Sequence, residues 1–305
     1  MKKKIIFIVG PTAAGKSEAA VILAKKINGD IISCDSMQVY KGMDILTSKP
    51  LKSARKGVKH YLIDEIDPGK DFDAFQYRKL ALKAINQIIT KGRVPVFVGG
   101  TGLYMSALIN GLFEAGARDA KIVKKLYSQA EKYGSMKLYK KLMNVDPDAA
   151  VKIHPNDLKR IIRALEVLET TGKPISLLQR QRSGLCKDYD IRAFCINPDR
   201  HVLYQRINSR VERMFDEGVI KEVKNLLKKR LNRSASYAIG IKEVKGYIKG
   251  EYPLEEAKAR MKLNTRHYAK RQLTWFRKDP RIKWLSIKGS ETPKEIAKNL
   301  WKELS

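Results

Sequence analysis

The segment Ile5–Ser17, which reads IIFIVGPTAAGKS, decides the fold of this 305-residue chain. It begins with five consecutive apolar residues, as expected for a short strand that is buried on both faces of a parallel sheet. The next eight residues match the pattern GxxxxGK[ST], and helical apolar spacing follows Ser17. This order of strand, glycine turn and helix predicts a phosphate-binding loop, because backbone N–H groups and a helix N-terminus converge there.

The loop also predicts the chemistry of its residues. Lys16 is expected to reach the terminal phosphate, and the Ser17 hydroxyl is the candidate ligand for Mg²⁺. We assign phosphate contact to the whole loop, namely Gly10, Pro11, Thr12, Ala13, Ala14, Gly15, Lys16 and Ser17. The motif leaves the reaction open.

Outward from the loop, short apolar runs alternate with helical patterns. Strands are predicted at 31–33, 60–63 and 94–98, and helices at 17–27 and 75–91. Such alternation predicts an α/β fold, a P-loop NTPase-like parallel sheet with its ligands at the carboxyl ends of the strands.

Two further loops follow strands of this predicted sheet. Asp35 and Ser36 follow the second strand, and the sequence Gly99–Gly102 follows the fourth. Asp35 could serve as a general base, as a Mg²⁺ ligand or only as a loop-capping carboxylate. Glycine turns after strands are common, so the second loop is a weak signal by itself.

The pattern changes after about Leu112. Helical spacing dominates from Asp119 to Gln181, and a strand pattern returns at Ile191–Ile196. We therefore predict a P-loop core over 1–112, a helical insertion domain over 113–190, and the rest of the core, with basic C-terminal helices, over 191–305. Two of these helices are expected at about 201–228 and 254–276.

The charge of the chain points to a polyanion. Lys plus Arg total 62 against 32 acidic residues, a formal net charge of +30, and a field of that sign attracts nucleic acid. Lys159, Arg160 and Arg163 lie opposite the apolar face of a predicted helix, and 258–283 holds ten basic residues and one acid. The alternatives are a solvated helix face and a generally lysine-rich composition.

Other signals exclude several classes of protein. The three cysteines have no metal-ligand spacing, and their odd number argues against a disulfide framework. The apolar run at the N-terminus is too short for a signal peptide, and no stretch reaches transmembrane length. We expect a cytoplasmic protein without a membrane partner.

Five stretches together resemble one family, the tRNA dimethylallyltransferases, also called tRNA isopentenyltransferases. They are GPTAAGKS, ISCDSMQVYKGMDILTSKP (Ile32–Pro50), VGGTGLY (Val98–Tyr104), NDLKRIIRALEV (Asn156–Val167) and TRHYAKRQLTWFR (Thr265–Arg277). They occur in order along nearly the whole chain, and DSMQVYKGMDI and AKRQLTWFR are far more specific than the P-loop.

The resemblance implies transfer of a dimethylallyl group from dimethylallyl diphosphate to N6 of the adenosine immediately 3′ of the anticodon in tRNA. It implies that the P-loop holds the diphosphate with help from Mg²⁺. It further implies that Asp35 is the catalytic base, that Thr101 bonds the diphosphate near the breaking bond, and that Arg210 contacts the diphosphate.

The resemblance also implies where the RNA is held. The target base leaves its stack, the insertion closes on the anticodon arm, and the protein is a monomer. The implied tRNA contacts are Asp35, Ser36, Met37, Gln38 and Thr101, with Lys159, Arg160, Ile161, Ile162 and Arg163 on the insertion.

Three positions depart from the family pattern. Leu46 stands where a glycine is usual, Val123 where the insertion has an arginine that contacts tRNA, and Ile241 where an aromatic residue is common. Leu46 puts the local backbone shape in doubt, and we do not transfer the arginine's role to Val123.

Two alternatives remain open. A small-molecule or nucleotide kinase also has a P-loop, and it would bind ATP and consume it. A noncatalytic RNA-binding P-loop protein would leave Asp35 and Thr101 without a role.

Overall fold

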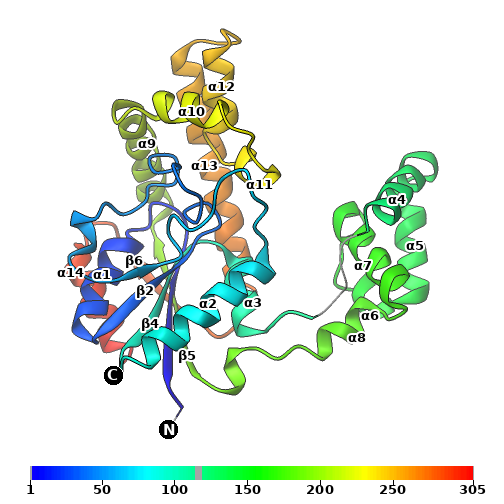
Figure 1. Ribbon diagram of the computed structural model, residues 1–305, viewed down its shortest axis with the longest axis horizontal. Helices are drawn as coiled ribbons and strands as arrows, with labels where there is room; N and C mark the ends of the chain where they lie inside the picture. The colour runs from blue at the N-terminus through cyan, green and yellow to red at the C-terminus, as the bar shows by residue number, and fades with distance from the viewer. Residues whose placement is uncertain (1, 114–118, 305) are drawn as a thin grey trace. The chain divides into compact units, whose positions relative to one another are not determined.

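The computed structural model describes residues 2–113 and 119–304 (Figure 1). The chain forms two compact units. The sheet unit comprises Met1–Ile109 and Asp188–Ser305, and the helical unit comprises Asn110–Lys187. The predicted insertion, 113–190, covers nearly the same residues as the helical unit.

The sheet unit contains a parallel sheet of six strands in the order β3-β2-β4-β1-β5-β6. The strands are β1 (Lys4–Val9), β2 (Gly29–Cys34), β3 (His60–Tyr61), β4 (Val94–Gly99), β5 (Asp190–Pro198) and β6 (Ile282–Ile287). In the register, Ile6 of β1 lies between Val96 of β4 and Arg192 of β5. The predicted α/β fold is therefore confirmed, and the loops after β2, β4 and β1 emerge side by side at one edge.

Helices cover both faces of this sheet. On one face α1 (Lys16–Lys26) and α14 (Pro293–Lys302) pack on Ile6 and Ile8. On the other, α2 (Ala74–Ile89) and α3 (Gly102–Ile109) are joined by the stacked rings of Tyr77 and Tyr104, whose centroids lie 3.8 Å apart. Strands covered on both faces need apolar side chains in both directions, which explains the unbroken IIFIV run.

A second group of helices gathers beyond one end of the sheet (Figure 1). It comprises α9 (Arg200–Asp216), α10 (Val219–Leu227), α11 (Arg233–Ser236), α12 (Ile241–Ile248) and α13 (Leu254–Phe276). The single helix predicted at 201–228 is wrong, because Gly218 has a φ of 95° and separates α9 from α10. The predicted helix at 254–276 coincides with α13.

The helical unit contains α4 (Ala120–Tyr133), α5 (Ser135–Val145), α6 (Pro147–Ala150), α7 (Leu158–Thr171) and α8 (Ile175–Arg180). The Asp157 carboxylate caps α7 by accepting the N–H of Arg160 at 3.2 Å, as expected of an N-cap aspartate. Leu126 and Leu165 belong to a separate apolar core. The described part of this unit contains no strand, as predicted.

One predicted strand is too long, and one strand was not predicted. The strand predicted at 60–63 is limited to His60–Tyr61, because Leu62 and Asp64 have positive φ angles. β6 was not predicted, and its half-exposed pattern as an edge strand explains why. No helix in residues 2–113 or 119–304 is long and apolar enough to cross a membrane.

Candidate active site

The P-loop lies between β1 and α1, and its backbone is held in special conformations. Gly10 has a φ of 141°, and a Cβ there would lie 2.5 Å from the Ile196 carbonyl oxygen of β5. Ala13 and Gly15 follow with φ angles of 63° and 85°. Left-handed residues at these positions let successive N–H groups turn toward one point. This backbone geometry is compatible with the predicted phosphate-binding role of the loop.

Lys16 points its ammonium into the loop. Nζ donates hydrogen bonds to the carbonyl oxygens of Gly10 at 3.0 Å and Pro11 at 2.6 Å. Burial, and then the positive charge of Arg210, lower the pKa of Lys16 to about 8, against the opposing effect of Asp35. A phosphate that reaches the loop would favour the charged form of this lysine.

Thr12 connects the P-loop to two helices of the C-terminal group. Its hydroxyl accepts a hydrogen bond from Arg210 Nη1 of α9 at 2.7 Å, and its N–H donates to Gln272 Oε1 of α13 at 2.9 Å. Burial lowers the pKa of the Arg210 guanidinium, while Asp35 acts against that shift. The structure thus places the predicted Arg210 at the P-loop.

Asp35 is the first residue after β2. Its Oδ1 accepts the N–H groups of Met37 at 2.8 Å and Gln38 at 3.3 Å, the pattern of an Asx turn. One carboxylate oxygen is therefore fixed by the backbone. Asp35 can therefore cap the loop through Oδ1 and still use its other carboxylate oxygen, Oδ2, in a reaction.

Thr101 joins the Asp35 turn to the glycine loop after β4. Its Oγ1 accepts the N–H of Ser36 at 3.0 Å, and its N–H donates to the Cys34 carbonyl oxygen at 3.1 Å. The Tyr268 hydroxyl of α13 lies near Thr101, and burial followed by the Asp35 charge raises its pKa. These contacts bring Asp35, Ser36 and Thr101 together.

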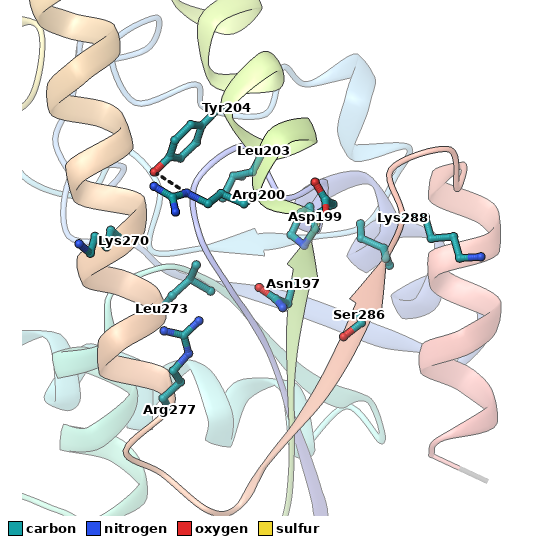
Figure 2. A pocket seen from close by; sticks show the side chains of 12 residues that line it. Asn197, Asp199, Arg200, Leu203, Tyr204, Lys270, Leu273, Arg277, Ser286 and Lys288 are labelled. Carbon is teal, nitrogen blue, oxygen red and sulfur yellow. Dashed lines mark hydrogen bonds between the residues drawn. The ribbon is translucent and has the colours of Figure 1, made fainter.

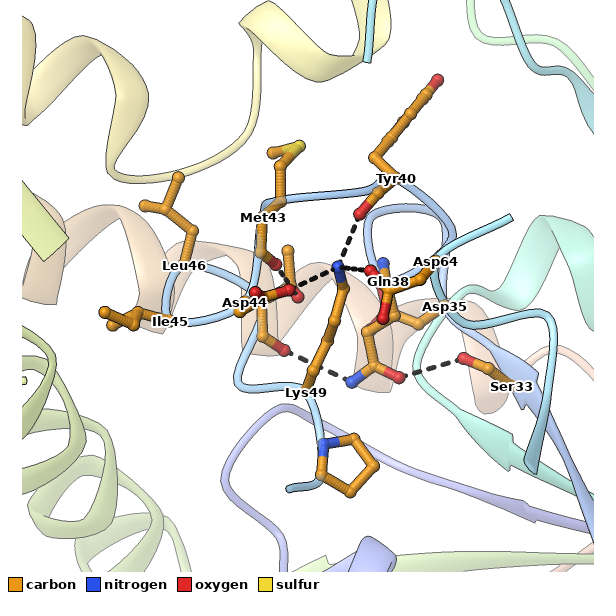
Figure 3. A network of polar contacts seen from close by, with 12 residues as sticks. Ser33, Asp35, Gln38, Tyr40, Met43, Asp44, Ile45, Leu46, Lys49 and Asp64 are labelled. Atoms are coloured by element: carbon orange, nitrogen blue, oxygen red, sulfur yellow. Dashed lines mark hydrogen bonds and ion pairs between the residues drawn. The ribbon is translucent and has the colours of Figure 1, made fainter. Parts of the chain in front are cut away.

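The segment after Asp35 is held by a polar network (Figure 3). Gln38 accepts the Ser33 hydroxyl at 3.0 Å and donates to the Thr47 carbonyl oxygen at 3.3 Å. The Lys49 side chain is 4% exposed and bonds to the Tyr40 carbonyl oxygen at 2.6 Å. Lys49 also pairs with Asp44 at 2.8 Å and Asp64 at 2.5 Å. The predicted tRNA-contacting turn therefore has a rigid base.

Glu222 of α10 holds the same segment from the other side. Its Oε2 accepts the N–H groups of Asp44 at 2.9 Å and Ile45 at 2.8 Å, and its Oε1 accepts that of Leu46 at 2.9 Å. Three N–H groups on one carboxylate form charge-assisted bonds, which are stronger than neutral ones. No sequence pattern indicates this role, because 176 or more residues separate the partners.

The departures from the family pattern are accommodated by packing. Leu46 is not among the described non-glycine residues with positive φ, so its backbone does not require glycine. Its side chain is buried, and a Cβ on Gly240 would lie 2.3 Å from Leu46 Cδ2. Ile241 is 3% exposed, and Val123 packs against the core of the helical unit.

The candidate tRNA-binding helix, α7, belongs to the helical unit. Lys159 is exposed, Arg160 pairs with Asp157 at 3.3 Å, and Arg163 pairs with buried Glu166 at 2.9 Å. Ile161 and Ile162 are 0% and 1% exposed, so their side chains pack in the apolar core of the helical unit. The predicted contact of this stretch with tRNA stays a prediction, and the exposed side chains of Lys159 and Arg160 are the ones available to it.

The protein groups available for Mg²⁺ are few. No cluster of three or more His, Cys, Asp or Glu suited to a metal occurs in the described chain. Mg²⁺ beside a P-loop takes phosphate oxygens, water and one or two protein ligands, so this result is compatible with such a site. Ser17, exposed at the start of α1, fits the hydroxyl ligand.

The basic stretch 258–283 divides into two parts. At its start Lys258, Arg260 and Lys262 are paired with three carboxylates, those of Glu212, Glu255 and Glu256. Lys270 and Arg277, by contrast, form no ion pair with a described carboxylate. Within this stretch, the positive charge available to a polyanion therefore includes Lys270 of α13 and Arg277 directly after it.

A cavity of ≈ 690 Å³ lies at the carboxyl ends of β5 and β6 (Figure 2). It is lined by Arg200 and Tyr204 of α9, by Lys270 of α13 and Arg277 directly after it, and by eight further residues. None of the predicted phosphate-binding residues lines it. Tyr204, however, packs in the same apolar cluster as Ala13, so the cavity adjoins the P-loop.

Comparison with known proteins agrees with this geometry. The family model described as IPP transferase matches residues 38–279. The tRNA dimethylallyltransferase of Thermoanaerobacter sp. strain X514 is 46% identical over 100% of this chain and 98% of its own length. That of Geobacter sulfurreducens is 48% identical over 93% and 92%, respectively.

Solved structures are similar over most of the chain. The tRNA isopentenylpyrophosphate transferase of Bacillus halodurans gives a TM-score of 0.72 at 41% identity, covering 99% of this chain and 97% of that one. A eukaryotic dimethylallyltransferase acting on tRNA gives 0.78 at 32% identity, covering 93% and 74%. With the P-loop, Asp35, Thr101 and Arg210 assembled in one sheet unit, this chain belongs to the IPP transferase family, the tRNA prenyltransferases.

Proposed function

We propose that this chain transfers a dimethylallyl group from dimethylallyl diphosphate to N6 of the adenosine immediately 3′ of the anticodon in tRNA. The observation that carries the proposal is the meeting of three loops at neighbouring strands. The P-loop, the Asp35 turn and the Thr101 loop follow β1, β2 and β4, which are adjacent in the sheet, and Ser36 bonds to Thr101.

In this reaction the P-loop binds the leaving group. Adenosine N6 attacks C1 of the dimethylallyl group, the C1–O bond breaks, and the electron pair leaves with the diphosphate. The loop amides, Lys16 and Arg210 neutralise the charge that builds on the departing oxygens. The bond from Arg210 to Thr12 supports this role.

Asp35 is the proposed base. An exocyclic amine is a weak nucleophile, so it benefits from a carboxylate that takes its proton as the N6–C1 bond forms. The Asx turn holds Oδ1 of Asp35, which orients the carboxylate. Thr101, tied to the same turn, is proposed to bond the diphosphate near the breaking bond.

Mg²⁺ is proposed as the cofactor, with the Ser17 hydroxyl as its protein ligand. The ion would supply positive charge to the diphosphate when bound. We also propose that the anticodon arm contacts the Ser36–Gln38 turn and the exposed Lys159 and Arg160, and that the protein acts as a cytoplasmic monomer.

The test is a reaction of the purified full-length protein with dimethylallyl diphosphate, Mg²⁺ and unmodified tRNA. Mass spectrometry of the digested tRNA should find one prenylated adenosine per molecule, next to the anticodon. A second reaction with ATP in place of the prenyl donor distinguishes the proposed transferase from the alternative, a kinase. ADP formation without modified adenosine would favour a kinase and overturn the proposal.

A further inference from the structure

Gln272 is a buried amide on α13 that joins two loops of the site. Only 5% of the residue is exposed to solvent. Oε1 accepts the N–H of Thr12 at 2.9 Å, and Nε2 donates to the Gly100 carbonyl oxygen at 3.0 Å. One loop offers a donor and the other an acceptor, so a neutral amide satisfies both at once.

The glycine loop is shaped to admit this side chain. A Cβ on Gly100 would lie 1.9 Å from Gln272 Nε2, and a Cβ on Gly102 would lie 2.0 Å from Trp275 Cδ1. Real Cβ atoms do not approach other atoms so closely. The glycines therefore permit α13 to rest on the loop, a role separate from providing N–H groups.

The two loops that Gln272 joins have different tasks in the proposed reaction. Thr12 lies in the P-loop, which is proposed to bind the diphosphate, and it accepts a hydrogen bond from Arg210. Gly100 directly precedes Thr101, which is proposed to bond the diphosphate near the breaking bond. Both ends of the amide are engaged, so this side chain adds to the pairing of Val9 with Gly99 in setting the spacing of the P-loop from Thr101. Pre-organised spacing of this kind matters most in the transition state.

We propose that Gln272 is a positioning residue that holds the P-loop at a fixed distance from Thr101. The inference rests on the proposed function, because it concerns how a bound diphosphate meets Thr101 and Asp35. The amide acts through the two loops and not on the substrate. Its loss should slow the chemical step while the remaining loop amides and Lys16 still bind diphosphate.

The first experiment compares Gln272→Met with Gln87→Met. The control makes the same substitution at an exposed position of α2. For Gln272→Met we expect single-turnover prenyl transfer to fall by about 10- to 100-fold, as for misplaced reacting groups. The KM for tRNA and the Kd for inorganic diphosphate with Mg²⁺ should stay within about threefold of wild type, which is what separates a lost transition-state interaction from lost binding. The control should match wild type.

A second readout does not depend on prenyl transfer. The Thr12 amide hydrogen should exchange faster in Gln272→Met than in Gln87→Met, because it loses its acceptor. If wild type transfers no prenyl group, the proposed function fails, yet this exchange still tests the bridge. Unchanged exchange together with an unchanged transfer rate would overturn the positioning role.

A double variant separates positioning from simple support of the fold. Gly100→Ala alone should lower the melting temperature, because its Cβ meets the amide. Adding Gln272→Ala removes that clash and leaves Gly10 O at 3.3 Å as the nearest remaining neighbour, so the melting temperature should recover. The transfer rate should remain as low as in Gln272→Ala alone. Recovery of the rate together with stability would overturn the proposal.

Discussion

The charge state of Lys16 should make diphosphate binding depend on pH. Burial and Arg210 lower its pKa to about 8 in the free protein, and a bound diphosphate would raise it again. Below pH 8 the lysine is already charged and can bind the anion directly. Above pH 8 binding must take up a proton, so affinity falls as pH rises.

The size of the effect follows from that pKa. Lys16 is about 90% protonated at pH 7 and about 10% protonated at pH 9 for a single group with a pKa near 8. Affinity for dimethylallyl diphosphate should therefore drop about tenfold between these values, which is about 1.4 kcal/mol. The ligand contributes little itself, since phosphate esters complete their ionisation with a pKa of about 6.

Isothermal titration calorimetry measures both the affinity and the proton. Titrations at pH 9 in two buffers of different ionisation enthalpy should give uptake of nearly one proton per diphosphate bound, whereas at pH 7 uptake should be close to zero. Lys16→Met should bind weakly and without this pH dependence. An affinity constant from pH 7 to pH 9, or the same slope in Lys16→Met, would refute the reasoning.

Three further changes test the scaffold around the site. Glu222→Gln should destabilise the protein by about 1–3 kcal/mol in urea unfolding, because its NH₂ group replaces one of the acceptors for Asp44–Leu46; an unchanged midpoint would contradict this. Lys49→Met should cost about 1–3 kcal/mol by leaving a carbonyl and two carboxylates without their cation, and equal stability would show that the network contributes nothing. Gly102→Ala should shift the fluorescence of Trp275, whose ring must move from the new Cβ, while an unaltered spectrum would argue against that contact.

Local patterns were enough to predict five of the six described strands and the loops of the site. The apolar run before Gly10 and the loop pattern depend on neighbouring residues, so the sequence carries them directly. Asp35 and Thr101 could be placed at one edge because parallel strands share a direction. β6 was missed because an edge strand lacks continuous burial, and the break at Gly218 was missed because apolar spacing continues on both sides of it.

Contacts between distant segments could not be predicted. Gln272 meets Thr12 across 260 residues, and Glu222 meets Asp44 across 178; no periodicity encodes either pair. Gln272 lies in the family-specific stretch AKRQLTWFR. That stretch indicated the importance of the segment but not the hydrogen bonds that Gln272 makes. The family resemblance covers Lys159–Arg163 as one stretch and could not predict that α7 buries the side chains of Ile161 and Ile162.

The central claim is that the P-loop holds the leaving group while Asp35 serves the nucleophile. The most direct test is Asp35→Asn, an isosteric change that keeps the side-chain oxygen which accepts the Met37 N–H. Single-turnover transfer to tRNA should fall by about 10²- to 10⁴-fold, the range for loss of a general base, while the Kd for diphosphate changes by less than about threefold. Transfer at the wild-type rate, or a parallel loss of diphosphate binding, would contradict the account.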